Sequence, residues 1–318
     1  MGTLRVVSVS LGSRRRDHTA TVELLGRPVE IARRGVDGDV EAARRAIAEL
    51  DGRVDAIGLG GVDVYLQVGD ERYVLADGER LLRAAVRTPC VDGSGLKQTL
   101  EPRAVRWLAG HGPWPLAGRR VLLVSAFDRY GMACALEEIG CEVRYGDLMF
   151  HADVPYAIRS LAELERMARR LLREMVKLPI HMLYPTGTQQ ERPPEPRFLE
   201  HFAWAEVVAG DFHLIRRHLP GPEVLAGKAV LTQTTTAEDR AELAARGVRY
   251  LFTTTPLLAG RSFGTNALEA ALVAVAGRGA PLAAGEYEEM LDAMRYRPEV
   301  IDLAAEGGDP GAGARGSA

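Results

Sequence analysis

The chain has 318 residues, of which 47% are hydrophobic and 26% are charged, and its formal net charge at pH 7 is −3. This length suffices for two domains with separate cores, and the small charge gives no electrostatic reason to expect nucleic acid or a membrane surface as a partner. The three cysteines are odd in number and lack a CxxC spacing, which argues against a disulfide framework and fits a reducing cytoplasm.

Targeting and metal-binding signals are absent from the sequence. The N-terminus has no basic segment followed by a long apolar run, and no apolar stretch reaches membrane-spanning length. We therefore expect no signal peptide, no membrane contact and a cytoplasmic location. The seven histidines show no metal-type spacing such as HxH or HExxH, so the sequence predicts no metal site.

The first third of the chain shows mixed strand and helix patterns. Alternating apolar and polar residues around glycine-containing turns predict two antiparallel hairpins, and Asp39 is expected to cap an amphipathic helix that ends at Leu50. The expected elements are a strand at 5–11, a hairpin at 19–25 and 29–34, this helix, a buried strand at 54–59, a hairpin at 62–68 and 72–75, and a helix at 79–86.

From Gly118 onward, strand and helix patterns alternate regularly, which predicts a parallel, doubly wound sheet. Thr236 is expected to cap one of the helices in a capping box with Asp239. Strands are expected at 121–125, 142–145, 180–184, 206–209, 229–232 and 249–252. Helices are expected at 131–139, 161–178, 238–246, 267–275 and 282–294.

These patterns predict a two-domain α/β fold. The segments 88–101 and 116–131 are typical of a joint between two domains, because a glycine-rich polar segment precedes an apolar strand and its turn. The expected parts are an N-terminal α/β substrate domain (1–115), a Rossmann-like domain (116–280), a C-terminal helix (281–305) and a disordered tail (306–318).

Small polar residues follow almost every expected strand of the second domain. In an open parallel sheet, ligands bind outside the carboxyl ends of the strands, so this rim favours a binding crevice. The alternative is a set of ordinary turn and capping residues. The strand-end residues are Ser125–Asp128, Gly146 and Asp147, residues 185–188, Gly210 and Asp211, Thr234–Thr236, and Thr253–Pro256.

The sequence predicts a dinucleotide, NAD or NADP, at this rim. An acid after the second strand, here Asp147, is suited to accept hydrogen bonds from an adenosine ribose, which favours NAD; capping of the next segment is the alternative. The turn 125–131 has a single glycine and places Asp128 where phosphate would approach, although Arg129 could compensate. The expected cofactor-binding residues are Ser125, Phe127, Asp128, Arg129, Gly131, Asp147, Thr234 and Thr254.

Asp92 and Lys97 form the expected catalytic pair. A lysine beside a carboxylate can take the proton of a carbinol while it orients the oxygen, and Gly93 and Gly95 allow close approach of a ligand. A hinge loop with a surface lysine is the alternative. The expected substrate-binding residues are Ser10, Ser94 and Asn266.

A further candidate lies at the end of the first strand. Ser10–Ser13, followed by Arg14–Arg16, Asp17 and His18, could form an anion pocket, and a plain turn with solvated charge is the alternative. The same segment suggests a phosphoryl-handling module, because its strand–hairpin–helix order resembles half of an actin-like ATPase domain. No second half of such a module is visible in the sequence.

Three segments together resemble the shikimate/quinate dehydrogenase family: 90–101, 116–124 and 133–140. The Asp92-Gly93 pair matches the Asp-Gly of the family's substrate motif, and the turn and helix at 262–275 resemble those that return toward the substrate domain. The chain is most similar to a bacterial branch labelled quinate 5-dehydrogenase. The resemblance implies a Rossmann domain, NAD(P) and a substrate contact by Asp92.

The sequence departs from that family at three places. Cys90 and Val91 replace the expected Asn-Thr, the glycine-rich turn is replaced at 125–128, and residues 1–87 contain no match to the family's lysine motif. Lys97 is therefore proposed from local chemistry and is not carried over from the resemblance.

Two functions of different classes follow. The first is an NAD(P)-dependent oxidoreductase that acts on a hydroxylated cyclic carboxylic acid similar to quinate or shikimate. The second is a non-redox ligand-binding protein or transferase on the same scaffold that has lost dinucleotide binding. Both require a small-molecule partner, and the sequence leaves a homodimer open.

Overall fold

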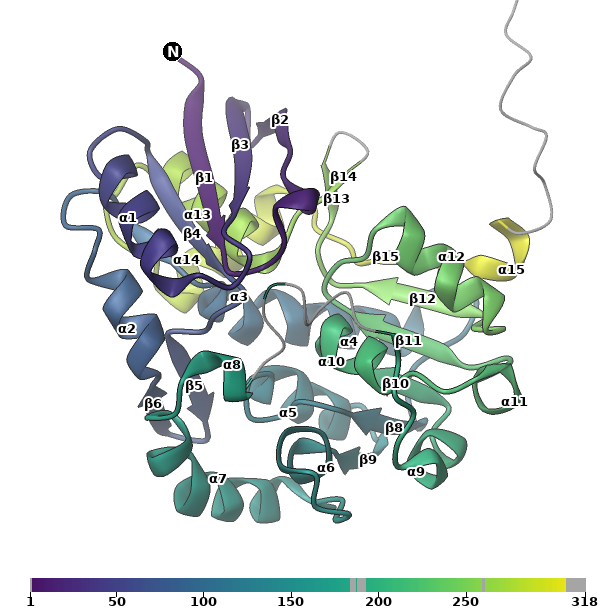
Figure 1. Cartoon of the computed structure of the whole chain (residues 1–318). Coiled ribbons are helices and arrows are strands. Elements are labelled where there is room, and N and C mark those ends of the chain that lie inside the picture. Colours follow the sequence, from purple (N-terminus) through teal and green to yellow (C-terminus); the bar gives the residue numbers. More distant parts are fainter. Residues whose placement is uncertain (1, 184–186, 188–192, 259–260, 307–318) are drawn as a thin grey trace, which may run out of the picture.

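The computed structural model describes residues 2–183, 187, 193–258 and 261–306. Two sheet-bearing domains lie side by side, one mainly purple and blue at the upper left of Figure 1, the other teal and green below and to the right. The chain therefore has the two-domain α/β architecture, with a Rossmann-like sheet in the second domain, that the sequence predicts.

The first domain is built on a five-stranded sheet, ordered β2 (Thr19–Leu24), β3 (Arg27–Gly35), β1 (Leu4–Ser10), β4 (Ala56–Gly60) and β7 (Cys90–Val91). Strands β2 and β3 are antiparallel, which confirms the first predicted hairpin, and the other neighbours are parallel. Because side chains alternate along a strand, Val7 and Val9 pack with α1 (Val40–Leu50), whereas Val6 packs with α13 (Thr265–Ala276).

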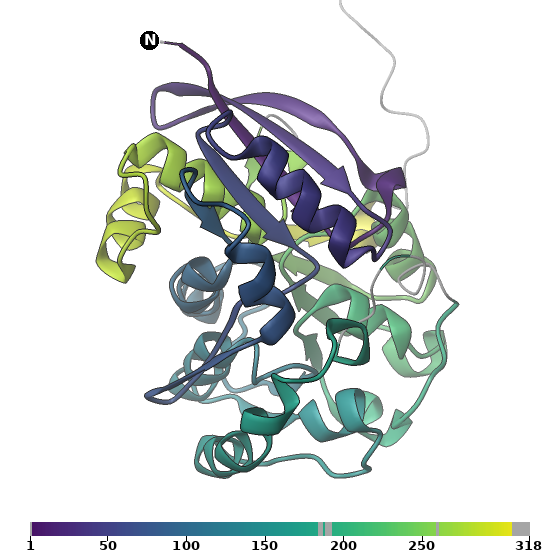
Figure 2. The ribbon, with the colours of Figure 1, turned by 60° about the vertical axis from the view of Figure 1, so that its left-hand side comes forward.

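The two faces of this sheet are covered by different parts of the chain. Figure 2 shows α1 over the near face of the strands, with α13 and α14 (Ala284–Ala293) in yellow-green beyond them. Helix α13 was expected within the unit 116–280, yet it packs on β1 and β4 of the first sheet. Nine of its twelve residues are buried, so its apolar surface needs cover on several sides.

The second domain holds a six-stranded sheet, ordered β15 (Glu299–Asp302), β12 (Tyr250–Thr253), β11 (Ala229–Thr232), β10 (Val207–Ala209), β8 (Arg120–Leu123) and β9 (Glu142–Tyr145). All neighbours are parallel except β12 and β15, which are antiparallel. Strands β10 and β11 are wholly buried, as expected for a parallel sheet with helices on both faces. The antiparallel edge strand β15 was not predicted.

The second predicted hairpin (β5 and β6) and the capping box of Thr236 and Asp239 are confirmed. Further helices and strands surround the two sheets. They are the 3-10 turn η1 (Arg14–Arg16), β5 (Tyr65–Val68), β6 (Glu71–Val74), α2 (Ala76–Leu82), α3 (Ser94–Gln98), α4 (Leu100–Gly110), α5 (Tyr130–Glu138), α6 (Asp147–Ala152), α7 (Leu161–Met175), α9 (Leu199–Trp204), α10 (Phe212–Arg217), α11 (Pro222–Leu225), α12 (Ala237–Ala245), β13 (Leu257–Leu258), β14 (Arg261–Ser262) and α15 (Leu303–Glu306).

The strand expected at 180–184 is wrong over the residues described, because α8 (Ile180–Leu183) is helical. Pro179 precedes this turn, and the carboxylate of Asp77 accepts a hydrogen bond from the amide of Ile180 at 2.9 Å. The amide of Ile180 therefore donates to a side chain and not to the backbone carbonyl of a neighbouring strand. An apolar run of this length cannot be assigned to a strand or a helix by periodicity alone.

Two expectations fall largely outside the described residues. These are the disordered tail, apart from residue 306 in α15, and the strand-end segment 185–188, of which only Gly187 is described. Within the described parts of the chain, no helix combines the length and the apolar character needed to cross a membrane.

Candidate functional site

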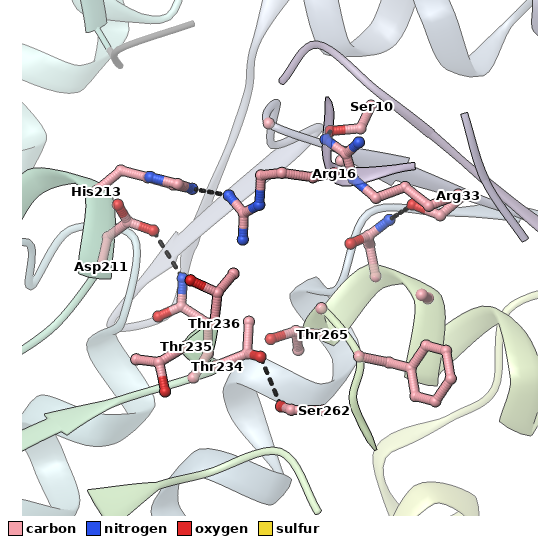
Figure 3. A pocket seen from close by; sticks show the side chains of 18 of the residues that line it. Ser10, Arg16, Arg33, Asp211, His213, Thr234, Thr235, Thr236, Ser262 and Thr265 are labelled. Atoms are coloured by element: carbon pink, nitrogen blue, oxygen red, sulfur yellow. Dashed lines mark hydrogen bonds between the residues drawn. The ribbon is translucent and has the colours of Figure 1, made fainter. Parts of the chain in front are cut away.

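A cavity of about 800 Å³ lies between the two domains. The carboxyl ends of β1 and β4 border it on one side, and the residues that follow β10 and β11 border it on the other. Figure 3 shows side chains of both domains directed into one open space. The crevice predicted at the strand ends of the second sheet is thus shared between two sheets.

Charged side chains make up much of the cavity lining. Among the described residues that line it are six arginines and lysines and four aspartates and glutamates. Together with two histidines they are Arg15, Arg16, His18, Arg33, Asp63, Lys97, Asp128, Arg129, Asp211, His213, Glu238 and Arg240. Three of the cations, Arg33, Arg129 and Arg240, pair with acids outside the lining. Arg16 has no described carboxylate within ion-pair distance, and its charge favours an anionic ligand.

Lys97 forms a buried charge cluster with two aspartates at the cavity. Its Nζ lies 2.6 Å from Oδ1 of Asp63 and 3.0 Å from Oδ1 of Asp128. Burial alone would lower the pKa of Lys97, but the carboxylates of Asp128 and Asp63 outweigh it and raise the pKa above its ordinary value. Lys97 is therefore held as an ammonium ion.

Asp63 is the titrating member of this cluster. Burial raises the pKa of Asp63 to about 7 against the opposing charge of Lys97, and the charges of Asp128 and Asp92 add to the rise. A carboxyl group with such a pKa can give or take a proton near neutral pH. The cluster thus offers a ligand one fixed cation and one exchangeable proton.

Arg129 holds a second buried cluster together. It donates a hydrogen bond to Glu101, and its guanidinium nitrogens lie 3.7 Å from Oδ2 of Asp211 and 3.8 Å from Oδ2 of Asp128. Arg129 and Glu101 are almost completely buried, and Glu101 belongs to α4, which follows the joint between the domains. This cluster ties α4 to the turns after β8 and β10.

The turn expected to hold a dinucleotide is occupied by a side chain of the protein itself. The carboxylate of Asp147 accepts hydrogen bonds from the amides of Ala126 (3.1 Å) and Phe127 (2.8 Å). In a dinucleotide-binding turn, such amides face the phosphates. Burial raises the pKa of Asp147 to about 7 despite these two donors. Asp147 thus faces the turn amides, and its expected contact with a ribose is not supported.

Close packing fills the space on the α3 side of this turn. A Cβ built on Gly131 would lie 2.9 Å from the carbonyl oxygen of Lys97, so the turn is packed directly against α3. Ser125 is fully buried, and its Oγ accepts a hydrogen bond from the amide of Asp211 at 3.3 Å. The residues of the turn therefore do not fit the pyrophosphate of NAD or NADP.

Two arginines of the first domain point into the cavity from the opposite side (Figure 3). Arg33 donates to Oγ of Ser10 at 3.0 Å and forms an ion pair with Asp17 at 2.7 Å. Arg16 donates to Nε2 of His213 at 2.8 Å, which bridges the two domains. Since Nε2 accepts this bond, His213 is neutral there, and its burial, aided by the charge of Arg16, lowers its pKa.

Helix α13 begins at the cavity and brings several polar groups to it. Asn266 donates from Nδ2 to Oγ of Ser8 at 2.6 Å, which anchors the helix start to β1. Just before the helix, the hydroxyl of Ser262 lies 2.5 Å from that of Thr234, which follows β11. Together these contacts connect the second sheet, the helix and the first sheet around the same cavity.

Six of the predicted site residues line the cavity, and seven do not. The lining residues are Ser10, Lys97, Asp128, Arg129, Thr234 and Asn266. The predicted residues outside the lining are Asp92, Ser94, Ser125, Phe127, Gly131, Asp147 and Thr254.

The structure does not form the predicted pair of Asp92 and Lys97. Lys97 donates to Asp63 and Asp128, as described above. Asp92 is buried, and its carboxylate accepts hydrogen bonds from three backbone amides, those of Val64 (2.5 Å), Tyr65 (3.2 Å) and Ser94 (3.0 Å). Asp92 therefore ties the joint between the domains to the hairpin that precedes it.

Sequence reasoning did not select four residues that the structure brings to the cavity: Arg33, Asp63, Asp211 and His213. Asp63 follows the glycine-rich end of β4, and Asp211 was noticed only as a strand-end residue. The predicted anion pocket after the first strand was the available signal, because four of its residues line the cavity: Ser10, Arg15, Arg16 and His18. In the part of the chain that is described, no cluster of three or more metal-ligating side chains occurs.

The fold and cleft define a two-domain α/β protein with a charged cavity between its domains. Residues 95–303 match the model of a family described as a domain of unknown function, DUF8754, and residues 5–92 match a second one, DUF8753. The first match spans more than half of the chain, so the protein belongs to the DUF8754 family. The boundary between the matches falls beside Gly93, in the joint between the two sheets. Neither description mentions shikimate or quinate, so that resemblance stays a prediction.

No protein with a curated description matches the sequence. Among solved structures, a hetero-hexameric glutamate dehydrogenase from Thermus thermophilus is similar at 15% identity and a TM-score of 0.47, covering 92% of this chain and 73% of its own. A sugar-transport substrate-binding protein from Bordetella parapertussis has 13% identity, a TM-score of 0.36 and coverages of 97% and 92%.

Dipicolinate synthase A chain from Bacillus subtilis is similar at 11% identity and a TM-score of 0.29, covering 93% of this chain and 98% of its own. At these scores the three similarities carry no argument about ligand or reaction.

Proposed function

We propose that this protein binds a small anionic molecule in the cleft between its two domains. One observation carries the proposal: arginines of the first domain and the start of α13 border a single cavity of about 800 Å³ at strand ends. This volume suits a metabolite-sized ligand, and strand ends are where α/β sheets bind ligands. The charge of Arg16, which has no described carboxylate within ion-pair distance, favours a negative charge on that ligand.

The cluster of Lys97, Asp63 and Asp128 supports a chemical role in addition to binding. These groups face the same cavity and present an ammonium ion beside a carboxyl group whose pKa burial raises to about 7. A hydroxyl or amino group of the ligand placed beside them would meet both a hydrogen-bond donor and a proton acceptor. This arrangement favours a non-redox transferase over a protein that only binds its ligand.

A panel of anions tests the proposal directly. Thermal unfolding is measured with phosphorylated and carboxylated metabolites and with neutral sugars of similar size. We expect some anions and no neutral sugar to raise the melting temperature. The variant Arg16→Gln should lose this shift, because Arg16 lines the cavity, while Arg44→Gln, an exposed arginine of α1, should keep it. Stabilisation by neutral sugars alone, or equal shifts in both variants, would rule the proposal out.

The second candidate is an NAD(P)-dependent oxidoreductase that acts on a hydroxylated cyclic carboxylic acid. Asp63 favours it, because a carboxyl group whose pKa burial raises to about 7 lies on the cavity and could take the carbinol proton, while the ammonium ion of Lys97 beside it could orient the oxygen. The closed turn with Asp147 weighs against it. Calorimetric titration with NADH and NADPH separates the two candidates. An absence of saturable binding up to millimolar concentration would remove the oxidoreductase.

A cytoplasmic location, a homodimer and the lack of nucleic-acid or membrane partners remain proposals from the sequence. Light scattering of the purified protein during gel filtration would decide the oligomeric state. Fractionation of the source cells would decide the location.

A further inference from the structure

Helix α13 begins at the cavity without a side-chain cap. Its N-cap residue is Gly264, and its first turn carries no acidic side chain. The first amides of a helix lack partners within the helix and place a partial positive charge at its N-terminus. The N-terminus of α12, which also borders the cavity, differs: a capping box of Thr236 and Asp239 satisfies it.

Thr265, the first residue of α13, gives a second and independent sign of a ligand. Its side chain lines the cavity, only 6% of the residue is exposed, and its Oγ1 is buried without a hydrogen-bond partner. Figure 3 shows Thr265 facing the open space that Arg16 and Arg33 border from the other domain. Because an unsatisfied buried hydroxyl is unfavourable, a partner supplied from the cavity would stabilise this orientation.

Both arginines border the same space, Arg33 with its charge paired to Asp17 and Arg16 with no described carboxylate beside it. Arg33 is held in place by Ser10 and Asp17, with only 16% of its side chain exposed. Arg16 contacts the neutral ring of His213, and no described carboxylate lies within ion-pair distance of it. Its charge is therefore available to a ligand that enters the cleft.

We infer that the N-terminus of α13, Thr265, Arg16 and Arg33 form a subsite for the phosphoryl group of the ligand, which makes the ligand a phosphomonoester. The inference rests on the proposed function and names the ligand class of the same cleft. The donors come from two domains and from different directions, which suits the three oxygens and the near-double charge of a tetrahedral phosphate. A planar carboxylate offers two oxygens and half that charge.

Calorimetry with inorganic phosphate tests the subsite. Thr265→Val removes the hydroxyl and keeps the side-chain shape, and we expect it to weaken phosphate binding about tenfold. Arg16→Gln should weaken it by at least as much. The matched control is Thr254→Val, because the hydroxyl of Thr254 is also buried without a partner but lies outside the cavity lining. Thermal unfolding without phosphate verifies that each variant is folded.

The phosphate-binding experiment has four outcomes, and each supports or overturns the subsite. Weakened binding in Thr265→Val and Arg16→Gln, with unchanged binding in Thr254→Val, supports the subsite. Equal phosphate affinity in all variants overturns it, because phosphate then binds elsewhere. If malonate binds the wild-type protein and phosphate does not, the subsite is overturned while anion binding in the cleft stands. If no anion of the panel binds, both proposals fail.

Discussion

Arg16 donates a hydrogen bond across the cleft to Nε2 of His213, with 2.8 Å between the two nitrogen atoms. Arg16 belongs to η1 of the first domain, and His213 belongs to α10 of the second. Since a guanidinium group only donates, the contact requires a neutral imidazole. Burial, with a contribution from Arg16, holds the pKa of His213 below its ordinary value, although Asp211 opposes the shift. The interdomain contact is therefore specific to the unprotonated histidine.

Acid should weaken this contact and, with it, the folded state. Because the folded-state pKa of His213 is lowered, the unfolded chain takes up its proton first as the pH falls, so the free energy of unfolding decreases below about pH 6.5. Glutamine does not titrate, so His213→Gln should lose less stability than the wild type between pH 7 and pH 5. Urea unfolding at both pH values measures this difference.

The other charges that face His213 are the same in both proteins, namely Asp211, Asp239, Arg16 and Arg216. Because the charge of His213 is one of the causes that lower the pKa of Asp211, the comparison reports the histidine together with this coupled aspartate. Equal losses of stability in the two proteins would show that His213 does not couple the cleft to pH.

The lysine of the buried cluster should be the most sensitive charge at the cleft. In Lys97→Met, the carboxylates of Asp63 and Asp128 remain buried without their cation, and we expect a loss of about 3–5 kcal/mol in the free energy of unfolding at pH 7. The loss should grow from pH 7 to pH 8, because without the opposing charge of Lys97 the pKa of Asp63 lies higher still, and the folded variant must keep a proton that the unfolded chain releases. Denaturant unfolding of Lys97→Met and of the exposed control Lys177→Met checks this. A loss below 1 kcal/mol at both pH values would contradict a charge-balancing role.

Local patterns were sufficient to predict much of the fold. The period of apolar residues in 39–50 and the alternation in 19–34 each reflect burial of one face, and both elements were confirmed. The prediction failed at α8, where a contact from Asp77, distant in sequence, decides the conformation. It also missed β15, whose four residues pair antiparallel at the sheet edge.

The site was predicted less well, because it depends on which segments the folding brings together. Lys97 was noticed for its place in a glycine-rich loop, but its partner Asp63 lies 34 residues earlier in the chain. Arg16 and His213 are separated by 197 residues, and no local pattern connects them. Asp147 was expected to contact a cofactor because it follows a strand, and only the structure shows that it caps the neighbouring turn instead.

The closed turn should tolerate no added side chain. A Cβ at Gly131 would lie 2.9 Å from the carbonyl oxygen of Lys97 and from Cγ of Pro102, so Gly131→Ala should lower the free energy of unfolding by about 1–3 kcal/mol. A Cβ built on Gly285 in α14 would have no neighbouring atom within 4 Å. Because alanine favours a helix more than glycine does, Gly285→Ala should raise the free energy of unfolding by about 0.5–1 kcal/mol. Urea unfolding of both variants measures the opposite signs. Equal changes in the free energy of unfolding of the two variants would show that the turn has room for an added methyl group.

Asp92 should prove structural, in contrast to the substrate contact that the family resemblance implies. Its carboxylate accepts three backbone hydrogen bonds, whereas an asparagine has one oxygen and would turn its amide group toward the donors of Val64 and Tyr65 or of Ser94. Asp92→Asn should therefore lower the free energy of unfolding by about 1–3 kcal/mol. The affinity of Asp92→Asn for any anion that binds the wild type should stay within about twofold, a binding free-energy change of RT ln 2. A larger change is not expected, because Asp92 lies outside the cavity lining.

The comparison variant is Asp63→Asn, which alters a side chain that lines the cavity beside Lys97 and should change the anion affinity. Calorimetry and urea unfolding on both variants separate the two roles. If Asp92→Asn abolished anion binding while its stability matched that of the wild type, the carboxylate would contact the ligand, and the backbone contacts seen here would belong to a state that ligand binding rearranges.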